Sequence, residues 1–466
     1  MIRALVRGAT VALLVPTAVA AQPLSADELL RAVDRAVPLL EQARQDVVLA
    51  QGELREAAGA FDLTLGASAK RTRGFYDNDR IGSYLELPLA PLGLNVFGGY
   101  RTSRGTFAPY DGQAATLSKG ELNAGIDLPL LKNRTIDARR AGRAVAELGV
   151  EVAGRGLDKM RLAVFKDALS EYWDWAAAGQ QLRIARALLD LAEARDQQLA
   201  DAVALGQIAA VERTDNRRAI LQRRAALVAA ERAVQMKAID LSLYLRGADG
   251  APLRPAPERL PALPAPAAPL TRDEAQEVAE ALQRRPELAA LRAKRRQQEV
   301  ELRLAENGVL PSLTWFADAA RDLGEGPGSR AGASFETGLS FSLPVQRRAA
   351  TGKVLQQRAK LATLDQDLRW AEDTIRAEVQ DALSAVAAAR AALDLARDEV
   401  AVAGELEGLE RDRFALGDST QFVVNLRELA TAEAAVREAR ALADYQKALV
   451  TVEAATGRLA DRVPRP

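Results

Sequence analysis

The sequence of 466 residues contains no cysteine and no histidine. It therefore cannot build a Ser-His-Asp or Cys-His nucleophile system, or a zinc site of histidine and cysteine. Carboxylates, lysine, tyrosine and hydroxyl groups remain for catalysis, and a carboxylate enzyme such as a glycosidase is the enzymatic alternative. The acidic residues, however, interleave with arginine along helix-like stretches, as they do on solvated faces. We therefore expect no enzyme, no cofactor and no metal site.

An excess of charge of one sign is also missing. The 63 basic and 63 acidic side chains give a formal net charge of +0, so the chain shows no overall basic excess for nucleic acid as a partner. Beyond the first residues, no apolar stretch resembles a spanning helix, for which a bilayer requires about 20 residues. If the chain enters a membrane, it must therefore do so as a closed β-barrel.

The first residues resemble an export signal. Arg3 and Arg7 precede an apolar run at 9–15, which is followed by the small residues 18–20. The run is too short for an anchoring transmembrane helix. We therefore expect residues 1–20 to be a signal peptide, and the exported chain to carry no lipid, because it lacks the N-terminal cysteine of lipoproteins.

A proline-rich segment divides the chain. Residues 248–270 contain seven prolines, which favours a stiff, extended connection over a helix or a central strand. The division predicts a first repeat at 21–247, a second repeat at 271–457 and a tail at 458–466.

The two halves carry matching landmarks in the same order, which predicts an internal duplication. Each half opens with a helix start of the Ser/Thr type, continues to a proline, and later has a Leu-Pro pair where strand-like residues end. The matched positions are Ser25 and Thr271, Pro38 and Pro286, Leu128-Pro129 and Leu343-Pro344, 167–170 and 381–384, and 204–206 and 415–417.

Long helical stretches follow the strand-like regions in both halves. The stretches 133–203 and 346–414 each hold about seventy residues, which corresponds to roughly 105 Å of helix. The helix after Gly417 carries two apolar seams at heptad spacing, and two seams imply two helical neighbours. The pattern predicts a helical bundle or a closed ring of helices. The first seam contains Phe422, Leu429, Val436, Ala443 and Val450, and the second contains Ala434, Ala441, Ala448 and Ala455.

Four stretches alternate between apolar and polar residues with a period of two, as strands do. They lie at 63–70, 121–128, 312–319 and 333–343. Strands of this kind suit either a water-filled barrel in lipid or a soluble sheet that covers helices. Because four strands are fewer than the eight of the smallest barrels, a membrane barrel must be shared among several chains. About thirty extra residues in the first half, the insert at about 76–117, predict additional strands or an elaborated outer loop.

The end of the chain is similar to the TolC-like outer-membrane efflux protein family. The small and aromatic positions from Phe414 to Gly457 have that family's spacing, and the motifs at 285–288 and 310–313 also resemble it. The resemblance implies an α+β fold and a homotrimer. Long helices would form a periplasmic α-barrel, and each chain would add four strands, or more from the insert, to a shared 12-stranded transmembrane β-barrel.

The same resemblance implies a function in transport. The trimer would lie in the outer membrane, in contact with its lipid, and would be the exit duct of a tripartite efflux pump or a type I secretion system. Its periplasmic tips would dock onto a membrane fusion (adaptor) protein, and an inner-membrane transporter would supply the energy. The alternative is a periplasmic adaptor or scaffold protein without a pore of its own. Such a protein is not expected to repeat a pair of strands between helices in both halves.

The resemblance also assigns tip and gate residues. Well-known members carry acidic residues six and nine positions after the second tip glycine, where this chain has Val423 and Leu426. The two residues therefore predict either a hydrophobic constriction instead of a cation-binding ring, or two side chains that pack in the helix seam. The same offsets in the first half hold Glu212 and Asp215. The tips are predicted at two turns in which glycine can adopt a positive φ. Their residues are Leu205, Gly206, Gln207, Leu416, Gly417, Asp418 and Ser419.

In some relatives an acid at the position of Glu212 holds the closed state through a tyrosine and an arginine. The matching positions here are Phe414 and Ser419. The resemblance therefore predicts a weakened lock.

Overall fold

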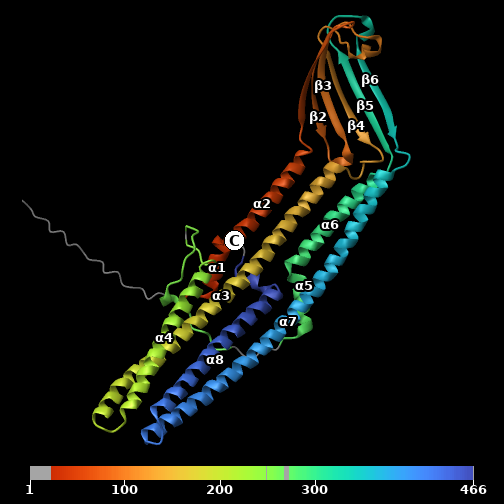
Figure 1. Cartoon of the computed structure of the whole chain (residues 1–466). Coiled ribbons are helices and arrows are strands. Elements are labelled where there is room, and N and C mark those ends of the chain that lie inside the picture. Colours follow the sequence, from red (N-terminus) through yellow and green to blue (C-terminus); the bar gives the residue numbers. More distant parts are fainter. Residues whose placement is uncertain (1–21, 248, 267–271, 465–466) are drawn as a thin grey trace, which may run out of the picture.

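The computed structural model describes residues 22–247, 249–266 and 272–464. The predicted signal peptide at 1–20, the tail positions 465–466, and positions 248 and 267–271 around the proline-rich segment lie outside the described residues. The molecule is elongated, with a β-sheet at one end and long helices that run away from it (Figure 1).

The helices follow the same order twice. Two short helices lead toward the sheet, one very long helix leads away from it, and a shorter helix turns back from the far end (Figure 1). In the first half these are α1 (Ala26–Ala36), α2 (Pro38–Gly59), α3 (Ala138–Ala204) and α4 (Ala210–Leu241). In the second half they are α5 (Glu274–Arg284), α6 (Pro286–Asn307), α7 (Arg348–Ala415) and α8 (Gln421–Ala455). The short 3-10 helices are η1 (Pro91–Gly93), η2 (Pro109–Ala114), η3 (Pro257–Arg259), η4 (Gly328–Arg330) and η5 (Arg458–Arg462).

The matching prolines separate the two short helices in each half. Pro38 and Pro286 are the first residues of α2 and α6, where the missing N–H costs nothing but the preceding helix cannot continue. Ser25 caps α1 by accepting a hydrogen bond from the Glu28 N–H at 3.1 Å. The cap of α5 is Asp273, which accepts from the Ala275 N–H at 3.2 Å, whereas the expected start at Thr271 lies outside the described residues.

The sheet has six antiparallel strands in the order of the sequence. The strands are β1 (Thr64–Thr72), β2 (Asn78–Pro88), β3 (Asn95–Gly105), β4 (Glu121–Pro129), β5 (Ser312–Asp322) and β6 (Ala333–Ser342). The four strands predicted from alternation are β1, β4, β5 and β6. The insert supplies β2 and β3, so the number of strands per chain is six, and of the two alternatives for the insert the structure has the additional strands.

The hydrophobic core lies halfway along the helices, where α1, α5 and the C-terminal residues gather beside the long helices (Figure 1). One buried cluster joins α1, α3, α4 and α8 and includes Phe165 and Trp175. A second cluster joins α5, α7 and α8 and includes Tyr445. Leu260 packs against the first cluster and Leu263 against the second. The described part of the proline-rich segment therefore connects the two.

Across the part of the chain that the structure describes, no helix is both long enough and apolar enough to cross a membrane.

Candidate functional site: the helix tips and the polar network behind them

The two tips lie at the end of the helices farthest from the sheet (Figure 1). In each turn, the residue after the glycine donates its N–H to a carbonyl five residues earlier, from Gln207 to Ala202 and from Asp418 to Arg413, both at 2.9 Å. Such bonds satisfy helix-end carbonyls and require a left-handed residue between them. Gly206 and Gly417 supply it.

The tip turns have φ angles of +71° at Gly206 and +84° at Gly417. The leucines before them are exposed, Leu205 to 72% and Leu416 to 79%. All seven residues predicted for the tips therefore lie in two turns of the same geometry. Each turn presents an apolar side chain.

The predicted gate residues lie on two facing helices just behind the tips. Glu212 and Asp215 are on α4, and Val423 and Leu426 are on α8. Both acids form hydrogen bonds to α8. Glu212 accepts from the backbone N–H of Gln421 at 2.8 Å, and Asp215 accepts from Asn425 Nδ2 at 3.1 Å.

The two apolar gate residues differ in exposure. Val423 is half-buried, and Leu426 is 51% exposed in a groove between α4 and α8 that Phe422 and Leu429 also line.

The bond from Glu212 caps a helix on another hairpin. Gln421 is the first residue of α8, and the side chain of the preceding Thr420 makes no capping bond. The first N–H groups of a helix have no partner within it, so the carboxylate from α4 satisfies one of them and also favours the positive end of the α8 dipole.

Glu212, the acid for which the sequence predicted a weakened lock, thus has a different hydrogen-bond partner. Glu212 bonds to Gln421 instead of Phe414 or Ser419, and Ser419 donates to Glu410 on α7. A pattern of side chains cannot reveal a bond to a backbone N–H, which every residue except proline carries.

One buried acid, Glu428 on α8, connects all four helices of the two hairpins. Its side chain is 0% exposed and accepts from Arg223 of α4 at 2.9 Å, Arg195 of α3 at 3.1 Å and Arg411 of α7 at 3.1 Å. Asn425 also accepts from Arg195 at 3.3 Å. A carboxylate with three guanidinium partners is well satisfied even without water.

Sequence reasoning missed this network, although a signal was present. Gln421, Asn425 and Glu428 follow the spacing i, i+4, i+7, which places three polar residues on one face of α8. All three are buried. The arginine partners could not be found in this way, because α3, α4 and α7 hold many arginines at similar spacing.

A second cluster links the hairpins nearer their middle. Asp174 of α3 accepts from Lys237 of α4 at 3.0 Å and from Lys447 of α8 at 2.8 Å. Burial raises the pKa of Asp174, but the hydrogen bonds from Lys447 and Lys237 lower it more, so its pKa lies below the ordinary value. The hairpins are therefore joined by charged side chains at two heights.

The stabilising effect of the network depends on pH, because it requires the ionised carboxylate of Glu428. Burial raises the pKa of this carboxyl, but Arg195 and Arg223 lower it more, so its pKa lies below the ordinary value of 4.5. A group whose pKa falls on folding stabilises above its unfolded pKa and loses that effect as the pH falls through the folded value. The charged groups that face Glu428 are Arg195, Arg223 and Arg411.

We therefore expect the network to stabilise the joined hairpins at neutral pH and to lose this effect as the pH falls through the lowered pKa of Glu428. The distance between spectroscopic labels on α4 and α8 of the purified protein, recorded against pH, measures this. A step near neutral pH would contradict the assignment, and Glu428→Gln should remove the acid step.

Comparison with known proteins finds a family that is similar to the second half of the chain. Residues 278–458, from α5 to η5, match the family model described as outer membrane efflux protein. Over this part, the chain is similar to the outer membrane efflux proteins. Outer membrane efflux proteins are channels rather than enzymes, and the match confirms the resemblance seen at the end of the sequence. It does not extend over the first half, which contains the insert.

Solved structures of outer membrane channels share the fold. The CmeC outer membrane channel of Campylobacter jejuni aligns with a TM-score of 0.64 at 13% identity, over 93% of this chain and 85% of that chain. The outer membrane protein VceC of Vibrio cholerae aligns at 0.62 and 14%, over 93% and 96%. The MtrE outer membrane channel of Neisseria gonorrhoeae, in its open state, aligns at 0.63 and 14%, over 93% and 88%. No curated protein sequence matches the chain.

Proposed function

We propose that three copies of this chain form a passive duct across the outer membrane and the periplasm, as the exit component of a tripartite efflux pump or a type I secretion system. The observation that carries the proposal is the continuity of a strongly amphipathic sheet with two very long helices. Helix α3 has 67 residues and α7 has 68, which corresponds to about 100 Å each.

In the proposed arrangement the sheet lies in lipid and the tips reach into the periplasm. Export by the predicted signal peptide at 1–20, without lipidation, would deliver the chain there. Residues 21–247 and 271–457 would be two structural repeats, joined by the segment 248–270.

Native mass spectrometry on protein extracted by detergent from the outer-membrane fraction tests the proposal. A trimer in that fraction supports the duct. A soluble periplasmic monomer would favour the alternative of an adaptor or scaffold protein without a pore, because six strands of one chain do not close a barrel.

The tips are the proposed docking site for a periplasmic membrane fusion protein, which would connect the duct to an inner-membrane transporter. Their support is the pair of exposed leucines, Leu205 and Leu416, which lie in turns of the same geometry. Exposed apolar side chains at a convex end are suited to insertion between helices of a partner.

Replacing Leu416 by aspartate should weaken adaptor binding by about 2 kcal/mol, roughly 30-fold, because it removes an apolar anchor and adds a charge. Stability should change by less than about 0.5 kcal/mol, because the side chain is 79% exposed. Co-purification of the membrane fusion protein with the trimer, after mild cross-linking in cells, measures the loss. Leu416→Met is the matched control, and equal recovery with all three proteins would reject this tip.

Val423 and Leu426 are proposed to form the constriction, with Glu212 and Asp215 holding α4 against α8 behind it. The support is that all four lie within two turns of the tips. A narrow apolar ring would resist the flow of water and ions until the hairpins move apart.

The variant Val423→Asp tests the constriction. Three carboxylates around one axis should bind divalent cations and make the conductance sensitive to millimolar Mg²⁺ or Ca²⁺, whereas the wild-type protein should not respond. Current recordings with and without added cation measure the effect, and Ala430→Asp, two turns along α8, is the control. An unchanged response would argue against Val423 as a pore-lining residue.

A further inference from the structure

We infer that the open edges of the sheet, β1 and β6, each pair with a neighbouring copy of this chain, so that a trimer closes a barrel of 18 strands instead of 12. The inference rests on the proposed trimeric channel and specifies its membrane part. Three copies with six strands each supply the 18 strands.

The two strands of the insert continue the surface of the other four. One row of paired residues crosses all six strands without a charge, in the order Leu65, Leu85, Gly98, Ala124, Ala319 and Phe335. The adjacent row on the opposite face contains four polar residues, Thr64, Glu86, Asp318 and Glu336, with Phe97 and Gly125 between them. The sheet therefore has one apolar face and one polar face over its whole width, as a barrel wall between lipid and water requires.

Charged residues on the apolar face occur only near one end of the strands. Arg71, Asp79, Arg104 and Arg321 all lie at the strand ends remote from the helices. Asp79 accepts from Arg71 at 2.8 Å, so two of these charges are paired. These residues mark the outer end of the apolar band, and β2 and β3 carry their charges at the same end as β1 and β5 do.

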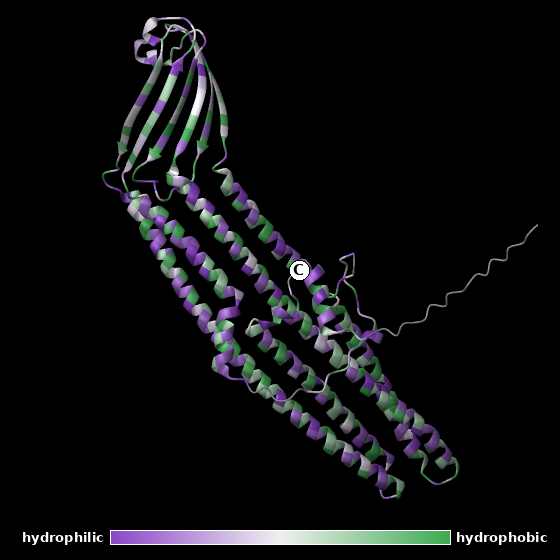
Figure 2. Cartoon of the chain, turned by 180° about the vertical axis from the view of Figure 1, so that it is seen from behind, coloured by the Kyte–Doolittle hydropathy of each residue, from purple (hydrophilic) through white to green (hydrophobic). Residues whose placement is uncertain are grey.

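Strand length agrees with this placement. Each of the six strands has between 9 and 11 residues, the number that a tilted strand needs to cross a bilayer. Hydrophilic and hydrophobic residues are mixed along all the strands of the sheet (Figure 2). A loop outside the membrane would need neither the length nor the alternation.

The hairpin β2–β3 is an integral part of the sheet rather than a flap on it. Strand β2 pairs with β1 from Asn78 to Glu86, and β3 pairs with β4 from Asn95 to Arg101. Strands β1 and β4 are thereby three strand spacings apart, about 14 Å. In a barrel of four strands per chain they would be neighbours.

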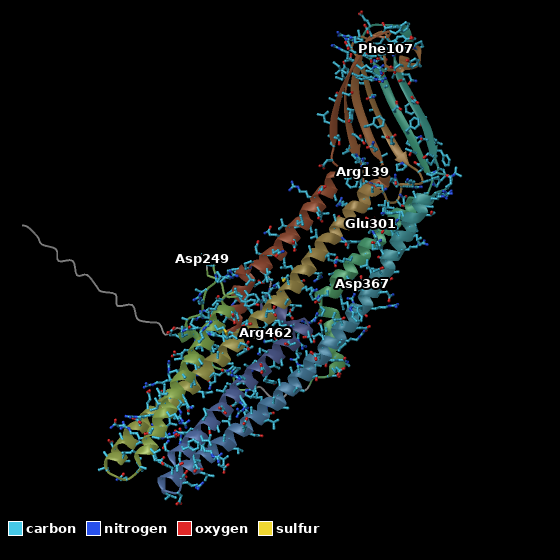
Figure 3. The ribbon with its side chains drawn as sticks, in the orientation of Figure 1. Phe107, Arg139, Asp249, Glu301, Asp367 and Arg462 are labelled. Atoms are coloured by element: carbon cyan, nitrogen blue, oxygen red, sulfur yellow. The ribbon has the colours of Figure 1, made fainter. Side chains whose placement is uncertain are left out.

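Both ends of the hairpin are anchored. On the helix side, Gly93 adopts φ +69°, and a Cβ there would approach the Asn133 carbonyl oxygen to 2.6 Å, so the turn is packed against the chain that leads into α3. On the outer side, Arg80 forms an ion pair with Asp111 and lies over the ring of Phe107 at 5.2 Å. Phe107 lies at the far end of the sheet, beyond the strands (Figure 3).

Each open edge of the sheet pairs with a strand from another copy of this chain. Strand β1 leaves the helices and β6 returns to them (Figure 1), so β6 of one copy meets β1 of the next in the antiparallel sense that all other neighbours have. Unpaired N–H and C=O groups at an edge cannot remain in lipid. Since barrel width grows roughly in proportion to strand number, 18 strands enclose a lumen about one and a half times as wide as 12 strands.

Cysteine cross-linking tests the strand order, because the chain has no cysteine of its own. The full-length protein is examined in outer-membrane vesicles with copper phenanthroline as the oxidant. The pairs Ala67→Cys with Ser83→Cys, and Tyr100→Cys with Leu122→Cys, report the neighbours β1–β2 and β3–β4. The pair Ala67→Cys with Leu122→Cys reports β1 beside β4.

The closure between copies is tested in the same vesicles. Ala67→Cys is combined in turn with Phe335→Cys, Thr337→Cys and Leu339→Cys, which sample the register between β1 and β6. We expect at least one combination to convert the monomer band of a non-reducing gel into covalent trimer, while the β1–β2 and β3–β4 pairs link within a chain and the β1–β4 pair does not.

The possible results separate the two proposals. Covalent trimers together with a β1–β4 link would overturn the 18-stranded barrel and leave a trimeric channel with 12 strands. Absence of any link between copies, with monomers only, would overturn both the barrel and the proposed function. Links at β1–β2, β3–β4 and β6–β1 with none at β1–β4 would establish the inference.

Discussion

Replacing Glu428 by alanine is expected to make the channel leak. The variant leaves Arg195 and Arg223 largely buried without their carboxylate, and removal of one partner from a buried ion pair costs about 3–5 kcal/mol. Because Glu428 connects the two hairpins, a loss of about 3 kcal/mol corresponds to a roughly 100-fold increase in the ratio of separated to joined hairpins. Basal conductance in a planar bilayer should rise accordingly.

Two further variants make the result specific to the network. Glu433→Ala removes an exposed acid from the same helix, little more than one turn away, and should leave the conductance unchanged. Glu428→Gln keeps the shape and part of the hydrogen bonding, and should give an intermediate leak. If Glu428→Ala conducts like the wild-type protein although its trimer is intact, the network does not hold the tips closed.

Replacing Trp175 by alanine is expected to destabilise the middle of the helices by about 3–5 kcal/mol. The side chain is fully buried in the cluster that joins α1, α3, α4 and α8. Its loss leaves a cavity that rigid helices fill only partly. Thermal unfolding in detergent, followed by circular dichroism, should show a midpoint lower by several degrees.

Trp370 on α7 offers the same substitution on the surface, since it is 74% exposed in the chain. Trp370→Ala should change the stability of a single protomer by less than about 0.5 kcal/mol. If both tryptophan variants unfold at the wild-type temperature, the cluster around Trp175 does not hold the helices together.

Much of the fold could be predicted from the sequence, because its periodicities are strong. The stretches 133–203 and 346–414 correspond to α3 and α7 within a few residues, and the four alternating stretches are strands. The turns at Gly206 and Gly417 were placed correctly, since glycine is the residue that adopts φ near +71° or +84° without strain.

The remaining features depend on contacts between distant parts of the chain. Strands β2 and β3 alternate weakly around Pro88 and Pro91, so their periodicity alone could not decide between strands and a loop. Their identity comes from pairing with β1 and β4. Likewise the cap that Glu212 provides for α8, 209 residues away, and the arginines around Glu428 arise only when the two hairpins pack together.

The open edges of the sheet also constrain how the protein is made. In the proposed trimeric barrel, a lone protomer could not enter lipid with its backbone satisfied, so insertion and association would have to occur together. The rate of insertion must then depend on protomer concentration with an order greater than one. Until partners arrive, the same edges can pair wrongly with other strands, and slow association prolongs that exposure. The amount of channel in the membrane should therefore rise more steeply than the amount of chain synthesised.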